Sequence, residues 1–211
     1  CMDLIELNKS IDKCSKEGKR IFAIVATLGT TVRGAIDPID NIGRICNERN
    51  IWLHIDGSIG GIFSITNLQI NGIINVNLAN SITINPQKIL GITKTSSLLI
   101  VSNIEILKNT FSTGLPYVST ENNLFNRGEL GIQGSRPAEI IKLWLGLRFL
   151  GMRGIEDVLN SSIERRIFFE NNLDTDKYDL YSGPLHIISF LPKGMNKNES
   201  DSWTLSKRIN L

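Results

Sequence analysis

Cysteine and histidine are scarce in this sequence. The three cysteines, Cys1, Cys14 and Cys46, form no C-x-x-C pair, and such an odd, sparse count does not suit a disulfide framework. We therefore expect a reducing, cytoplasmic compartment. The two histidines, His54 and His186, belong to no set of residues with zinc-ligand spacing, so the sequence predicts no metal site.

Long hydrophobic runs and an excess of one charge are also absent. No apolar stretch approaches the roughly 18 residues that a membrane span requires, and the N-terminus lacks the pattern of a signal peptide, so we expect neither membrane insertion nor secretion. The 23 Lys and Arg residues nearly balance the 21 Asp and Glu residues and are spread along the chain, which argues against a nucleic-acid partner. Hydrophobic residues make up 41% of the 211 residues, a share typical of folded domains.

The hydrophobic pattern predicts an α/β fold. Apolar residues recur at helical spacing over 4–17, and short apolar runs typical of strands lie at 21–27, 51–56, 81–85 and 96–102. The first two runs are continuous and suit strands that are buried on both faces. Between them, the Asp37 carboxylate is expected to cap a helix that Pro38 begins. Strand, helix and strand joined by short connections form the βαβ unit of a parallel sheet.

Helical patterns dominate residues 137–170. The first part is broadly apolar, and we expect Trp144 and its leucine neighbours to lie in the core. The part after Gly151 is amphipathic. A strand at LHIISFLP and a helix start at WTLSKRINL follow. We therefore predict a large domain over 1–135, connecting helices over 136–170, and the beginning of a small C-terminal α+β domain over 171–211.

Polar side chains follow three of the predicted strands. In open parallel sheets, ligands bind beyond the carboxyl ends of the strands. Asp56 and Lys88 lie at two of these ends, and they either form a plain ion pair or belong to a site. Burial beside apolar runs would lower the pKa of the Lys88 amine toward the neutral nucleophile that a Schiff base requires. Pyridoxal phosphate needs such a lysine, together with a carboxylate at its ring nitrogen.

Four segments of this sequence resemble a known family in their residues, order and spacing. They are ATLGTT at 26–31 continuing through GAIDPI, ICNERNIWLHIDGSIGG at 45–61, INPQK at 84–88, and GSRPAEIIKLWLGLRFLG at 134–151. The sequence resembles the group II pyridoxal-phosphate-dependent amino-acid decarboxylases, which include glutamate, aromatic amino-acid and diaminobutyrate decarboxylases. The resemblance implies a fold-type I, aspartate-aminotransferase-like architecture: a mostly parallel α/β sheet with part of a C-terminal small domain.

The resemblance also implies roles for individual residues. Lys88 corresponds to the lysine that forms a Schiff base with pyridoxal 5'-phosphate, and Asp56 to the partner of the ring nitrogen. Thr31 corresponds to a polar contact near the cofactor, and Asn85 to a phosphate contact. Ser58 falls where the family places a small alanine beside the ring.

Three further residues each carry two interpretations. Tyr117 falls near the tyrosine of the family's catalytic loop, where it would protonate the substrate α-carbon, or it is an ordinary loop tyrosine. His54 shares a strand face with Asp56 and either supports the site or is a satisfied core histidine. Arg136 either holds a carboxylate or caps local structure.

Two departures from the family stand out. Gln87 replaces the histidine that usually precedes the lysine, and an amide cannot carry a proton at neutral pH. The family's phosphate-binding turn and its ring-stacking aromatic residue belong upstream of Cys1. We therefore expect either the middle of a longer chain or an assembly with a polypeptide that supplies the N-terminal half, working as a homodimer with the site near the interface.

The resemblance predicts decarboxylation of an L-amino acid to its amine. Two alternatives stay open. One is decarboxylation-dependent aldehyde formation on the same scaffold. The other is a non-catalytic, truncated relative that acts as a partner subunit.

Overall fold

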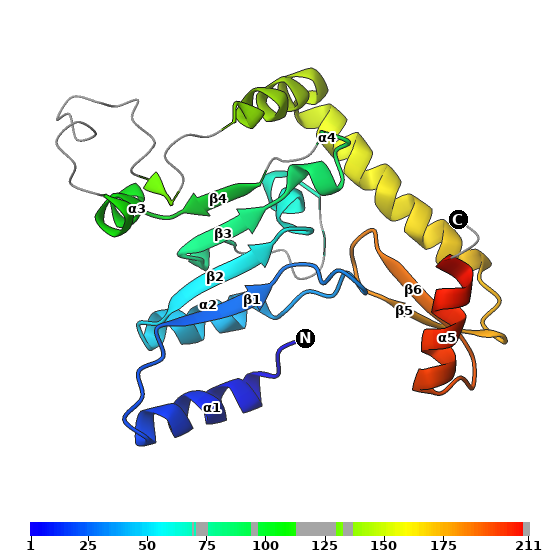
Figure 1. Ribbon diagram of the computed structural model, residues 1–211, viewed down its shortest axis with the longest axis horizontal. Helices are drawn as coiled ribbons and strands as arrows, with labels where there is room; N and C mark the ends of the chain where they lie inside the picture. The colour runs from blue at the N-terminus through cyan, green and yellow to red at the C-terminus, as the bar shows by residue number, and fades with distance from the viewer. Residues whose placement is uncertain (69, 71–75, 94–96, 113–129, 133–136, 209–211) are drawn as a thin grey trace.

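The structure is a computed structural model that describes residues 1–68, 70, 76–93, 97–112, 130–132 and 137–208. It has a four-stranded sheet with flanking helices, and a separate two-stranded sheet near the C-terminus (Figure 1). The long helix α4 (Glu139–Asn172) runs between the two sheets. Among the described residues, no helix is long and apolar enough to cross a bilayer.

The larger sheet is mostly parallel, as expected. Its order is β1 (Ala23–Thr27), β2 (Trp52–Gly57), β3 (Ser81–Ile84) and β4 (Leu98–Val101). The first three strands are parallel, whereas β4 runs antiparallel to β3. The apolar run at 96–102 therefore contains a strand, but one of reversed direction.

Only one face of this sheet is fully buried. The buried hydrophobic side chains of the parallel strands alternate along the chain and comprise Ile24, Ala26, Leu53, Ile55, Ile82 and Ile84, whereas on the other face only Ser81 is buried among these strands. The expectation that the first two strands are buried on both faces is wrong, because Val25 is 54% exposed and Trp52 and His54 are half-buried. Helix α2 (Ile39–Glu48) and the 3-10 helix η1 (Gly61–Ile65) contact the strands, and their buried residues all join this one core.

Helix α1 (Leu4–Lys16) forms where the periodicity predicts it, with Asp3 as its N-cap. Helix α2 begins differently from the prediction, because Pro38 is its N-cap and no side chain caps it. The Asp37 carboxylate instead accepts hydrogen bonds from the backbone N–H of Thr27 at 2.8 Å and of Met2 at 2.6 Å. Asp37 therefore ties the end of β1 to the N-terminal segment.

Four short helical elements have no counterpart in the predicted pattern. They are η1, η2 (Val76–Leu78), η3 (Pro86–Lys88) and α3 (Ile104–Phe111). Each is between three and eight residues long, and hydrophobic periodicity is not discernible in so few residues.

Helix α4 is interrupted at Gly151, whose backbone (φ 60°, ψ 177°) is not helical. The prediction that Trp144 and its leucine neighbours lie in the core is wrong for Trp144, which is 58% exposed, and for Leu145, which is 54% exposed. The segment before Gly151 reaches the core through Leu143, which is 3% exposed, and partly through other leucines of the helix. The rest of its apolar face is uncovered among the described residues.

The C-terminal part contains β5 (Tyr178–Ser182), β6 (Ile188–Pro192) and α5 (Lys197–Arg208). Strands β5 and β6 pair antiparallel, and the sequence indicated only the second of them. Helix α4 crosses residue 170 without a break there, so the predicted boundaries of 1–135, 136–170 and 171–211 stay a prediction.

Candidate active site

The carboxyl ends of β1, β2 and β3 bring the predicted site residues to one edge of the sheet. Thr27, Asp56 and Thr83 are direct neighbours across the three strands. The backbone N–H of Leu28 donates to the Asp56 carbonyl at 2.8 Å, which extends the β1–β2 pairing by one residue. Asp56 therefore occupies a central strand, held from both sides by backbone pairing.

The Asp56 carboxylate is held by the residue two positions further along. Ser58 donates to the Asp56 Oδ1 atom from its hydroxyl at 2.6 Å and from its backbone N–H at 3.1 Å. The Ser58 hydroxyl is the main reason why the pKa of Asp56 lies below its usual value. Burial opposes this shift, whereas the Ser58 N–H and the charges of Lys88 and His54 add to it. Asp56 is therefore an anion at neutral pH.

Lys88 lies at the end of the 3-10 turn that follows β3. Its backbone N–H donates to the Asn85 carbonyl at 3.0 Å, which closes this turn. The Lys88 side chain is exposed, so the expectation that burial desolvates its amine is not met within the described residues. Lys88 and Asp56 form no ion pair within 4 Å in the part of the chain that is described, yet the lysine charge lowers the Asp56 pKa through space.

Two amides flank this lysine. The Asn85 Oδ1 atom accepts a hydrogen bond from the Ser97 hydroxyl at 2.5 Å, which turns the Asn85 amide nitrogen away from Ser97. The Gln87 Oε1 atom is buried and has no hydrogen-bond partner among the described residues. Sequence reasoning missed Ser97, which no spacing rule connects to Asn85.

Thr31 lies in the loop after β1. Gly29 opens this loop with a left-handed backbone (φ 97°), and the Thr30 hydroxyl accepts from the Ala35 N–H at 3.0 Å. The Thr31 side chain itself is exposed. The loop therefore presents Thr31 at the same edge of the sheet as Asp56.

His54 is a satisfied histidine that also acts on the site. Its Nδ1 atom lies 2.8 Å from the Ser81 hydroxyl, and its Nε2 atom lies 3.3 Å from the Thr83 hydroxyl. The Trp52 indole N–H donates to the same Ser81 oxygen at 3.0 Å. These partners hold the imidazole on the sheet face that carries Asp56, whose pKa its charge lowers. Sequence reasoning missed Trp52, Ser81 and Thr83, although period-two alternation places all of them on this face.

Two predicted residues lie outside the described residues, namely Tyr117 and Arg136. Among the described residues, no group of three or more His, Cys, Asp or Glu side chains is placed to hold a metal ion.

The described residues fit pyridoxal 5'-phosphate. Ser58 engages only one oxygen of Asp56, which leaves Oδ2 to accept a hydrogen bond from a protonated ring nitrogen. The exposed Lys88 amine is accessible to an aldehyde, and the Asn85 amide nitrogen is a donor that the Ser97 bond does not use. An anionic acceptor, an accessible amine and an amide donor at neighbouring strand ends form the donor set that this cofactor requires.

Comparisons with known proteins point in the same direction. Residues 1–181 match the family model described as the pyridoxal-dependent decarboxylase conserved domain. The acidic amino acid decarboxylase GADL1 of Bos taurus is 33% identical over 164 residues, which cover 75% of this chain and 31% of that protein. The aromatic-L-amino-acid decarboxylase of Bacillus atrophaeus is 29% identical over 161 residues, covering 74% of this chain and 34% of that protein.

Solved structures show the same fold. The crystal structure of Oryza sativa TDC with PLP and tryptamine superposes with a TM-score of 0.88 at 19% identity, covering 99% of this chain and 46% of that one. The crystal structure of mouse CSAD gives a TM-score of 0.82 at 24% identity, covering 98% and 45%. The chain thus spans about a third of the length of the curated relatives that it matches and less than half of the solved ones.

Proposed function

Because this chain belongs to the pyridoxal-dependent decarboxylase family, we propose that it carries the Lys88 and Asp56 part of an enzyme that decarboxylates an L-amino acid to its amine. The observation that supports this proposal most is the Asp56 carboxylate, which Ser58 keeps ionised at the carboxyl edge of a parallel sheet close enough to Lys88 to sense its charge. A bare ion pair would bring these two side chains into direct contact, and they are not in contact.

Pyridoxal 5'-phosphate would supply an electron sink for breaking a bond at the substrate α-carbon. Lys88 would hold the cofactor through its Nζ atom. Asp56 would hold a proton at the ring nitrogen, because a carboxylate with a lowered pKa stays an acceptor at neutral pH. The negative charge of Asp56 would stabilise that protonated nitrogen.

Asn85 and Thr31 orient the cofactor in this proposal. The Ser97 hydroxyl fixes the Asn85 amide, so its nitrogen donates to a phosphate oxygen without first reorganising. Thr31 offers a hydroxyl from the loop after β1. Ser58 contributes little volume beside the ring and fixes the Asp56 carboxylate.

Tyr117 delivers the proton to the α-carbon after carbon dioxide leaves, since a phenol with a pKa near 10 is protonated at neutral pH. The complete site needs more chain than these 211 residues, in a homodimer or together with a polypeptide that supplies the N-terminal half. The similarity to relatives more than twice as long supports this arrangement.

Borohydride trapping tests the cofactor attachment. The protein is incubated with pyridoxal 5'-phosphate and reduced, and the labelled peptide is mapped by mass spectrometry. We expect the label on Lys88, because reduction turns an imine to a lysine amine into a stable secondary amine. The variant Lys88→Ala should lose the label and Lys94→Ala should keep it. A label on Lys94, or a coloured protein with no labelled lysine, would overturn the assignment.

Product analysis tests the reaction. The complete enzyme, offered acidic and aromatic L-amino acids separately, should release carbon dioxide and the corresponding amine in equal amounts. Aldehyde and ammonia in place of amine would favour the oxidative alternative. If the purified protein holds no cofactor and releases no carbon dioxide from any of these amino acids, the alternative of a non-catalytic partner subunit is favoured.

A further inference from the structure

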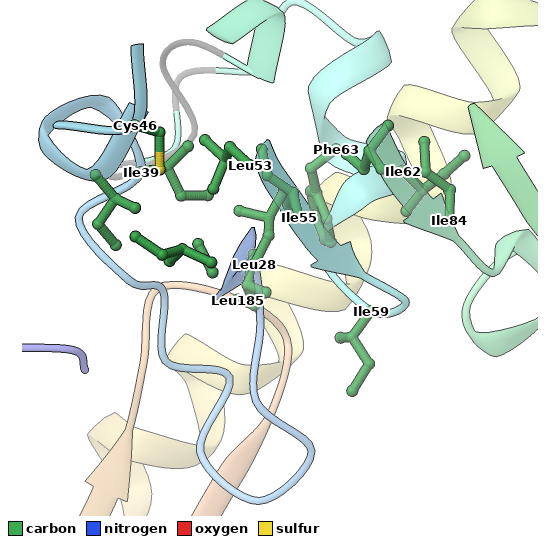
Figure 2. Packing of buried hydrophobic residues seen from close by; sticks show 14 of the residues in the cluster. Leu28, Ile39, Cys46, Leu53, Ile55, Ile59, Ile62, Phe63, Ile84 and Leu185 are labelled. Carbon is green, nitrogen blue, oxygen red and sulfur yellow. The ribbon is translucent and has the colours of Figure 1, made fainter. Parts of the chain in front are cut away.

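The segment between β5 and β6 lies against the loops that follow β1 and β2. Leu185, near the middle of this segment, has no exposed surface. Figure 2 shows the Leu185 side chain beside Leu28, the first residue after β1. Residues of the C-terminal part therefore enter the core directly beneath the proposed cofactor site.

Leu185 fills a space that two glycines leave. A methyl group on Gly29 would lie 2.6 Å from the Leu185 Cδ1 atom, and a methyl group on Gly60 would lie 3.0 Å from it. The first contact is shorter than real Cβ contacts and the second is tighter than most of them, so the Leu185 side chain packs where side chains on these two residues would lie. The two loops also join each other, because the Gly60 N–H donates to the Leu28 carbonyl at 2.9 Å.

Four further contacts hold β5, β6 and the segment between them against the loop after β1 and against η1. The Gly183 N–H donates to the Arg33 carbonyl at 2.6 Å, and the Arg33 guanidinium lies 4.9 Å from the centre of the Tyr181 ring. The Ser189 hydroxyl donates to a carbonyl of the β1 loop, that of Val32. Beyond the second loop, the rings of His186 and Phe63 stack with their centres 6.1 Å apart.

The loop after β1, which contains Gly29, and the loop after β2, which contains Gly60, are called the two glycine loops below. Both carry residues of the proposed site. Thr31 follows Gly29 by two positions, and Ser58, which holds the Asp56 carboxylate, precedes Gly60 by two. Glycine-rich loops sample many backbone conformations, so a site built on them needs packing from elsewhere to keep one geometry.

We propose that residues 183–187 form a clasp that holds the two glycine loops of the cofactor site in their binding geometry, with Leu185 as the positioning residue. This inference rests on the proposed function. Leu185 acts on the site through Gly29 and Gly60, the two backbones beside which it packs.

Leu185→Ala tests the clasp, with Leu159→Ala as the matched control. Leu159 is also fully buried, but it belongs to α4 and is not among the nearest neighbours of Gly29 or Gly60. Two quantities are measured in each variant. The first is hydrogen exchange of the Gly29, Thr30 and Gly60 amides, all of which are hydrogen-bonded in the native structure. The second is the dissociation constant of pyridoxal 5'-phosphate, from the absorbance of the bound cofactor.

In Leu185→Ala we expect these amides to exchange at least tenfold faster and the dissociation constant to rise at least fivefold. Leu159→Ala should change both quantities less than threefold, even where its thermal stability falls as much. Leu185→Met, which restores volume to the gap between the glycines, should return both quantities to within twofold of the native values.

The clasp proposal is wrong if the exchange rates and the dissociation constant change less than threefold in Leu185→Ala, or if they change equally in Leu159→Ala. If Leu185→Ala does not fold, Leu185→Val is measured against the same criteria. A complete enzyme that binds no cofactor would contradict the proposed function, whereas the amide exchange rates of the cofactor-free protein would still decide on the clasp.

Discussion

Ser58 places two hydrogen bonds on a single oxygen of Asp56, from its hydroxyl at 2.6 Å and from its backbone N–H at 3.1 Å. The resemblance to the decarboxylases implies a small alanine at this position, and a serine hydroxyl stands there in this chain. It lowers the pKa of Asp56 and leaves the second carboxylate oxygen open to another donor.

The first prediction follows from this pair. Ser58→Ala should raise the Asp56 pKa toward its ordinary value, because it removes the largest single cause of the lowering. The carboxyl carbon of Asp56, followed by NMR during a pH titration, measures the change. Ser64→Ala is the control, since the Ser64 hydroxyl donates to the Gly61 carbonyl and not to Asp56. If the Asp56 titration is unchanged in Ser58→Ala, the backbone hydrogen bond and the nearby charges alone are enough to lower the Asp56 pKa.

The same variant has a consequence for acid stability. The folded-state pKa of Asp56 lies below the unfolded one, so its contribution to stability is present above the unfolded pKa and is lost as pH falls through the folded pKa. Losing the Ser58 hydroxyl should lower the free energy of unfolding by about 1 kcal/mol at pH values above the unfolded pKa. The loss is no larger because water partly screens this half-buried carboxylate. Urea unfolding at pH 7 and near pH 3 measures it, and the deficit should shrink at the lower pH.

The second prediction concerns the Asp56 charge. Asp56→Asn keeps the shape of the side chain but removes its charge, so it should leave cofactor binding within about tenfold while turnover falls at least about a hundredfold, roughly 2.7 kcal/mol of barrier. Steady-state assays of the complete enzyme measure it, with the exposed Asp157→Asn as control. Turnover within about threefold of native, roughly 0.7 kcal/mol, would place the essential carboxylate elsewhere.

The third prediction concerns Tyr117. Tyr117→Phe removes only the hydroxyl, so carbon dioxide release should persist while protonation of the α-carbon slows. Molecular oxygen can then oxidise the unprotonated carbon, which yields aldehyde, ammonia and hydrogen peroxide instead of amine. Chromatography of products under air and under nitrogen measures the shift. Amine at the native rate with no aldehyde under air would identify another proton donor, with His54 the next to substitute.

The fourth prediction concerns an ion pair within α4 that a hydrogen bond links to β5. Arg166 contacts both carboxylate oxygens of Glu170, at 2.7 and 2.6 Å, and the Ser182 hydroxyl donates to the same carboxylate. Both side chains are mostly buried, at 12% and 18% exposed. Glu170→Ala should therefore lower the free energy of unfolding by about 3 kcal/mol, because it leaves the arginine charge buried and unpaired.

Chemical unfolding measures this loss, and Asp174→Ala is the control because its pair with Lys177 is exposed and should shift the unfolding midpoint little. Burial would raise the Glu170 pKa, but the hydrogen bond from Ser182 and the Arg166 charge outweigh it and lower it. The pair therefore stabilises the fold above the unfolded pKa of Glu170, and the contribution is lost as pH falls through the folded pKa. If Glu170→Ala and Asp174→Ala lose the same free energy of unfolding, burial of the Arg166–Glu170 pair does not strengthen its contribution.

Local pattern was sufficient to predict the strands that carry the site. The apolar runs before Asp56 and Asn85 are strands β2 and β3. A short apolar run is a local signal that predicts a strand without knowledge of the surrounding fold. The direction of β4 was not predictable in this way, because a run of Leu and Ile residues reads the same in either orientation. Burial was the least predictable property: Val25 and Trp144 are apolar, yet whether another element covers them depends on the whole assembly.

The contacts within the site were less predictable than its residues. The resemblance to the decarboxylases drew attention to Ser58, but only the coordinates show that its hydroxyl binds Asp56. Leu185 carries no sequence signal at all, because it is one more apolar residue before a strand. Its role depends on Gly29 and Gly60, which approach it only in the folded chain.

The clasp also sets an order of events during synthesis. Gly183 and Arg33, which it joins, are 150 residues apart in the sequence. At typical translation rates this separation corresponds to on the order of ten seconds between their emergence from the ribosome. The glycine loops beside the site are therefore synthesised well before the segment that holds them. Synthesis that ends before residue 183 yields a chain that contains strands β1 to β4 but lacks the clasp of the cofactor loops.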